Sequence, residues 1–189
     1  MTALLKSTIR SLLAIASLAI VSCSTNVDMP KGTSNGYTSA RLVQRNPNLT
    51  ASTTATQSKI HGMIQKSIAS QFNSHGLTYG HGNAELTVAY LVIYQEPGMT
   101  ARYEDYFGYG RSSEEIADLA HTRGVIDNKR PDYFKRAGIV VDVIDARTNK
   151  LIYRNFAAGD VVIGASDSTR AARIDTAVGQ ALAPFFGKS

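Results

Sequence analysis

Three aspartates in the carboxyl-terminal half of the chain are the first candidates for chemistry. Asp142, Asp145 and Asp160 could act as paired carboxylates in acid–base catalysis, or could bind a cation. Asp145 opens a stretch with the composition of a turn, where an aspartate can bond its own backbone. Asp142 is better explained by a cross-strand partner such as Arg154. We therefore expect structural roles for these carboxylates rather than catalysis or metal binding.

Other arrangements that could carry chemistry are incomplete. The histidines His61, His75, His81 and His121 are scattered over one predicted helix, its end and two loops. The spacing of His75 and His81 does not match a helical ligand pair, and no cysteine is free to complete a zinc site. No serine lies in a Gly-x-Ser-x-Gly elbow, and the Gly-Tyr-Gly over 108–110 is too short for a phosphate loop. We predict no catalytic residue, no metal site and no cofactor.

Cys23, the single cysteine, has the most specific chemical context. It excludes an intrachain disulfide. Lys6 and Arg10 precede an apolar run over residues 12–21, which is too short for a comfortable membrane span. The sequence Ile-Val-Ser-Cys over 20–23 resembles the lipobox of bacterial lipoprotein signal peptides. This resemblance implies that Cys23 is acylated on sulfur, becomes the new amino terminus and is acylated again there.

The lipobox also implies a location and a division of the chain. Several acyl chains anchor almost permanently, because each buried methylene contributes about 0.8 kcal/mol. Ser24 follows the cysteine, where an aspartate would favour inner-membrane retention, so we expect the outer membrane. The predicted parts are a signal peptide over 1–22, a lipidated flexible tether over 23–35 and one periplasmic domain over 36–189. An ordinary signal peptide with an incidental cysteine is the alternative.

The net charge does not favour a nucleic-acid partner. The formal charge is +5, and loss of Lys6 and Arg10 with the signal peptide leaves +3. No dense stripe of Lys and Arg and no basic-aromatic platform accompanies this mild excess. The expected contacts are the membrane, through acylated Cys23, and an envelope protein or cell-wall component.

A tyrosine-rich stretch within residues 98–133 is the candidate partner-binding loop. Tyr103, Tyr106, Phe107 and Tyr109 lie there among glycines and arginines. Tyrosine offers rigid apolar area with a polar tip, which suits interfaces. A long excursion between two strands is unusual and is often functional. The alternative is that these aromatic side chains cover the open face of the sheet.

A β-hairpin over residues 138–156 is the element around which the domain is organised. Aliphatic side chains alternate along its first strand, and residues 145–149 have the composition of its turn. A three-residue loop would place Asp142 opposite Arg154. Residues 157–163 would extend the second strand beyond a bulge near Gly159.

Two amphipathic helices accompany this hairpin. The expected elements, in chain order, are a strand over 37–43, a helix over 54–75 capped by Gly76, a central strand over 85–94, the hairpin, and a helix over 173–182 stopped by Pro184. The helix stripes need only one sheet face to bury against. We predict a single α+β domain with a mainly antiparallel β-sheet and two helices packed on one face, in the order β-α-β-β-β-α.

Taken together, these pieces resemble a bacterial lipoprotein family named only as domain of unknown function 4136. The likeness covers roughly residues 54–186, and its most specific part is the hairpin: an aliphatic strand, an Asp-Ala turn, then Leu, an aromatic and Arg. Tyr153 stands where the family usually has Trp, and Asn155 where it often has Gly. The family implies no agreed activity. We expect a non-catalytic envelope binding or structural module, with a periplasmic hydrolase or a lipid or small-ligand carrier as alternatives.

Overall fold

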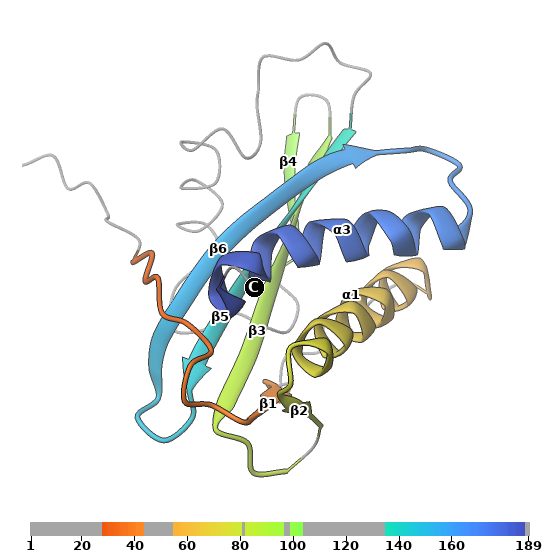
Figure 1. Ribbon diagram of the computed structural model, residues 1–189. Coiled ribbons are helices and arrows are strands. Elements are labelled where there is room, and N and C mark those ends of the chain that lie inside the picture. Colours follow the sequence, from red (N-terminus) through yellow and green to blue (C-terminus); the bar gives the residue numbers. More distant parts are fainter. Residues whose placement is uncertain (1–27, 44–54, 81, 97–98, 104–134, 188–189) are drawn as a thin grey trace, which may run out of the picture.

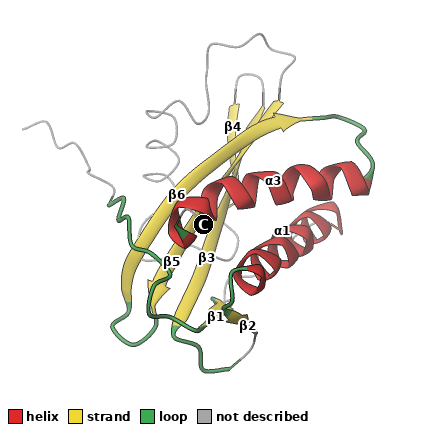
Figure 2. Ribbon diagram, viewed as in Figure 1, coloured by secondary structure: helices red, strands yellow, loops and turns green. Residues whose placement is uncertain are grey.

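The protein folds as six strands and two helices within the residues that the computed structural model describes, which are 28–43, 55–80, 82–96, 99–103 and 135–187. The elements are β1 (Ser39–Leu42), α1 (Ala55–Ser74), β2 (Thr78–Tyr79), β3 (Leu86–Glu96), β4 (Met99–Tyr103), β5 (Lys135–Asp145), β6 (Lys150–Val161) and α3 (Asp167–Phe186). The two helices lie side by side against one face of the sheet (Figures 1 and 2). The predicted α+β class, single domain and helix placement are confirmed.

The sheet is mixed, which refines the expectation of a mainly antiparallel one. Its order is β2-β1-β3-β5-β6, and β4 pairs with the carboxyl-terminal part of β3. The pairs of β3, β4, β5 and β6 are antiparallel, whereas β1 runs parallel to β2 and β3. Parallel neighbours need a crossover, and α1 supplies it between β1 and β3. The short strands β2 and β4 were not predicted.

The hairpin of β5 and β6 has the predicted register for a reason that the sequence did not reveal. Asp142 lies opposite Arg154, as expected. The loop between Asp145 and Lys150 holds four residues rather than three, and a register shift opposite Val143 and Ile144 compensates for the extra one. The irregularity therefore lies beside the turn, and the expected bulge near Gly159 was wrong, because pairing there is regular.

The carboxyl end of α1 has the predicted glycine cap. Gly76 has a φ of 84°, a conformation that glycine adopts without strain. The amide of Gly76 donates to the carbonyl of Asn73 at 3.1 Å, and the amide of Leu77 donates to the carbonyl of Phe72 at 3.0 Å. Leu77 and Phe72 are both buried, so the chain folds back on the helix as this motif requires.

The end of α3 corrects the prediction that Pro184 stops the helix. The helix begins after its N-cap Ser166, earlier than the expected residue 173, and passes through Pro184 to Phe186. Pro184 has no N–H to donate to the carbonyl four residues earlier, that of Gln180. The next carbonyl, that of Ala181, accepts bonds from the Tyr153 hydroxyl at 2.5 Å and the Asn155 side-chain amide at 3.0 Å. Contact with β6 thus supports the last turn of the helix.

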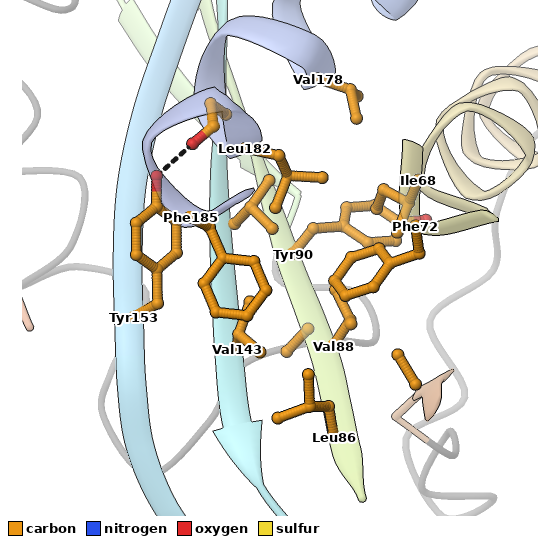
Figure 3. Close-up of a cluster of buried hydrophobic side chains, with 14 of the residues drawn as sticks. Ile68, Phe72, Leu86, Val88, Tyr90, Val143, Tyr153, Val178, Leu182 and Phe185 are labelled. Atoms are coloured by element: carbon orange, nitrogen blue, oxygen red, sulfur yellow. Dashed lines mark hydrogen bonds between the residues drawn. The ribbon is translucent and has the colours of Figure 1, made fainter. Parts of the chain in front are cut away.

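The hydrophobic core lies between the helices and the sheet (Figure 3). Phe72 and Phe185 have ring centroids 6.0 Å apart, and Tyr153 packs on Phe185 at 5.1 Å. Both the helices and the sheet contribute residues to this core, among them Ile64, Ile68, Phe72, Leu86, Val88, Tyr90, Val141, Val143, Tyr153, Val178, Leu182 and Phe185. This cluster joins α1, α3, β3, β5 and β6 into one unit.

Candidate functional site

Most of the residues predicted to bind a partner or to carry the lipid lie outside the described part of the chain. These are Cys23, Tyr106, Phe107 and Tyr109. Tyr103 is the last residue of β4, and its backbone pairs with Val92 of β3. The lipidation of Cys23 and partner binding by the aromatic residues therefore stay predictions.

The predicted pair of Asp142 and Arg154 is the most buried polar arrangement described. The two residues are 3% and 1% exposed. The Nε of Arg154 donates to Oδ1 of Asp142 at 2.6 Å, and Nη2 donates to Oδ2 at 2.5 Å. Neighbouring side chains on these strands, such as Val143 and Tyr153, pack on the helices (Figure 3), so alternation places the pair on the other sheet face. Because Arg154 occupies both carboxylate oxygens, we assign the pair a structural role.

Burial dominates the electrostatics of this pair. Burial raises the pKa of Asp142 above its ordinary value, and the hydrogen bonds and charge of Arg154 oppose that rise. The Nη1 nitrogen of Arg154 is buried and has no hydrogen-bond partner among the described residues. A buried donor without a partner costs free energy. The pair therefore depends on the two hydrogen bonds of its bidentate contact.

Asp145 has the turn role that the sequence predicted. Its Oδ1 accepts the backbone amide of Thr148 at 2.7 Å, and its Oδ2 accepts the hydroxyl of Tyr37 at 2.9 Å. These bonds hold the pKa of Asp145 below its ordinary value, with the Thr148 amide as the largest cause. The carboxylate thus ties the hairpin turn to the segment that leads into β1.

Glu85 makes a second carboxylate attachment at the same end of the sheet. It accepts the backbone amide of Thr38 at 2.6 Å and the Thr38 hydroxyl at 2.9 Å. The backbone amide of Thr38 is the largest cause of a lowered pKa for Glu85. Together, Glu85 and Asp145 hold the start of β1 against β3 and the hairpin.

These two carboxylates predict an acid-sensitive attachment of β1. Their ordinary pKa values are 4.5 for Glu85 and 3.8 for Asp145, and both are lowered in the folded protein. Depressed folded values mean that the stabilisation is complete above the unfolded pKa values and is lost as the pH falls through the folded ones. We expect urea stability to be level above the ordinary values and to fall below them, with a shallower fall in Glu85→Gln. An identical slope in the variant and the parent would contradict this assignment.

The described histidines take part in packing. The Nδ1 of His61 lies 2.8 Å from the hydroxyl of buried Tyr90, and His75 stacks on Phe186 with ring centroids 4.0 Å apart. His81 and His121 lie outside the described residues. Within the described ranges, no group of three or more His, Cys, Asp or Glu side chains is placed to hold a metal ion. Neither of the described helices combines the length and hydropathy of a membrane span.

The residues just before β1 form an attachment that the sequence did not predict. The carbonyl of Pro30 accepts the amide of Arg154 at 3.1 Å, and the amide of Gly32 donates to the carbonyl of Ile152 at 2.8 Å. The amide of Ser34 donates to the carbonyl of Phe185 at 2.9 Å. We call residues 30–34 the strap. These residues were expected in the flexible tether, but their backbone bonds fix them along the outer edge of β6 (Figure 1).

Gly32 explains why the strap lies so close to β6. A Cβ at this position would approach the Ile152 carbonyl oxygen to 2.5 Å, and that backbone atom cannot turn away. Glycine is therefore required at this position for close approach of the two backbones. In the sequence, Pro30 and Gly32 are typical of a linker, and no apolar alternation indicates a strand.

Comparisons with solved structures give distant likenesses, and two of them illustrate their extent. One is the PelC dodecamer from Paraburkholderia phytofirmans, with 10% identity and a TM-score of 0.41, covering 85% of this chain and 92% of that chain. The other is a PDZ domain protein from Parabacteroides distasonis, with 8% identity and a TM-score of 0.40, covering 76% of this chain but 32% of that one. A search of curated proteins finds no match.

A family profile matches most of the chain. The match runs over residues 32–185 and so extends from the strap to the end of α3. It contains the hairpin that carried the resemblance, including the turn at Asp145 and the Tyr153-Arg154 pair of β6. This chain belongs to the family described as domain of unknown function (DUF4136).

Proposed function

We propose that this protein is a lipid-anchored module of the bacterial outer membrane whose domain faces the periplasm and binds an envelope partner without catalysis. The observation that carries the proposal is the Ile-Val-Ser-Cys sequence over 20–23, which follows a basic and then an apolar segment. Only a thiol accepts the lipid, and a small residue before it lets the peptidase approach. Ser24 in the next position favours the outer membrane.

The described carboxylates support the non-catalytic part of the proposal. Asp142 is engaged by Arg154, and Asp145 by Thr148 and Tyr37. Asp142 and Asp145 are three residues apart on β5, whose pairing with β3 is uninterrupted between them, so their side chains point to opposite faces. Paired-carboxylate chemistry requires two carboxyl groups in one cleft, and this arrangement separates them.

Cell fractionation tests the anchor. In Cys23→Ala, we expect a chain that retains residues 1–22, carries no acyl group and is lost from the outer-membrane fraction. Ser22→Ala keeps a small residue before the cysteine and should fractionate like the parent. Ser24→Asp should stay acylated but move to the inner membrane. Recovery of Cys23→Ala in the outer membrane at the parent's level would refute the anchor.

Photocrosslinking tests partner binding. A photoreactive phenylalanine in place of Tyr106 should give a discrete adduct in cells that make the lipidated protein. The same group in place of Lys66, which is exposed on α1, is the matched control. Absence of an adduct from Tyr106, or the same adducts from both positions, would count against a binding role for the aromatic stretch.

A further inference from the structure

The strap and the lipid anchor are close together in the sequence, and this closeness limits how the domain can stand on a membrane. Four residues, 24–27, separate Cys23 from Asp28, the first described residue. Even fully extended, the five steps from Cys23 to Asp28 span at most about 18 Å. Strand β6, with 12 residues, spans about 40 Å. The tether is therefore much shorter than the domain that it holds.

The strap determines the part of the domain to which this short tether leads. Its bonds join Pro30 and Gly32 to β6, and Ser34 to the last turn of α3. Lys31 also forms an antiparallel bridge with Tyr153. In Figure 1, the strap and the β5–β6 turn lie on one side of the molecule, and the β6–α3 loop lies on the opposite side.

We propose that the domain rests on the lipid surface with its strap side, at the start of β6 beside the β5–β6 turn, and points the β6–α3 loop away from the membrane. This inference rests on the proposed acylation of Cys23. The strap converts a flexible attachment into an oriented one, because its backbone bonds fix the tether's end on the sheet. Val162 and Ile163, which are 46% and 74% exposed, are then presented to the periplasm.

The chain allows a clean measurement of this orientation. Cys23 is the single cysteine, and its thiol is consumed by the lipid, so an introduced cysteine is the only reactive one. Lys150 is exposed beside the β5–β6 turn, and Ile163 is exposed in the β6–α3 loop. A donor dye on Lys150→Cys or Ile163→Cys, in the full lipidated protein, reports its height above vesicles that contain an acceptor-labelled phospholipid.

We expect energy transfer to be several-fold more efficient from position 150 than from position 163. In Gly32→Ala, the added Cβ displaces the strap, so the difference between the two positions should be lost. Gly80→Ala is the matched control, because a Cβ at Gly80 meets open space. A flexible insertion between Val27 and Asp28 leaves the strap intact and should reduce the difference progressively with its length.

Equal transfer from the two positions in the parent, or a higher value from position 163, would overturn the proposed orientation. Retention of the full difference in both Gly32→Ala and the insertion series would also overturn it. The acyl groups are measured by mass spectrometry on the same samples. A protein without acyl groups would refute the proposed anchor, whereas an acylated protein with equal transfer would refute the orientation alone.

Discussion

Replacing Asp142 with alanine should destabilise the protein by about 3–5 kcal/mol, because it leaves the guanidinium of Arg154 buried and unpaired. Arg154 is 1% exposed, and within the described part of the chain its Nη1 has no partner. Without Asp142, its Nε and Nη2 would also lose their charged acceptor. Urea unfolding followed by circular dichroism measures the change. Asp145→Ala, on the same strand but only half-buried, is the comparison and should lose less.

A double variant separates the charge from the packing at this position. Asp142→Leu with Arg154→Met replaces the ion pair by apolar side chains, and such replacements are often neutral or stabilising. We expect the double variant to be far more stable than Asp142→Ala. If Asp142→Ala were as stable as the parent, the buried pair would not have the structural role assigned to it.

The second large effect is expected at Phe72, where α1 meets α3 and the sheet. Phe72 is 0% exposed and packs against Phe185 and Tyr79 at centroid distances of 6.0 and 5.5 Å. Truncation to alanine opens a cavity in the core and should cost about 3–5 kcal/mol. The measurement is the midpoint of urea unfolding at constant slope.

Phe186→Ala provides the comparison for Phe72→Ala. Phe186 is half-buried at the end of α3, where it stacks on His75, so its truncation removes less buried area. A smaller loss in Phe186→Ala than in Phe72→Ala is expected. The reverse order would mean that the core is not centred between the two helices and the sheet.

Elements with a strong hydrophobic period were predictable from the sequence. The alternation along β5 and β6 determines which side chains face the helices, and the register that pairs Asp142 with Arg154 follows from it. The register was predicted correctly although the loop has four residues rather than the three expected. The register shift beside the turn compensates for the additional loop residue. Burial of one face specifies pairing more strongly than the turn does.

Features that depend on distant contacts could not be predicted. A local rule indicated that Pro184 ends the last helix, but Tyr153 and Asn155 on β6 bond the nearby Ala181 carbonyl and support the turn. The strap has linker composition, and it is fixed through backbone atoms, which leave no pattern of side chains. The lipidation of Cys23 is the reverse case, because its signal lies wholly in the local sequence.

The central claim is that a lipid on Cys23 anchors a domain whose helices shield one side of a sheet. Mass spectrometry of the intact protein purified from bacterial membranes tests it most directly. The account predicts a chain that begins at Cys23 and carries added acyl mass on that residue. An uncut chain that begins at Met1, without acyl groups, would contradict it.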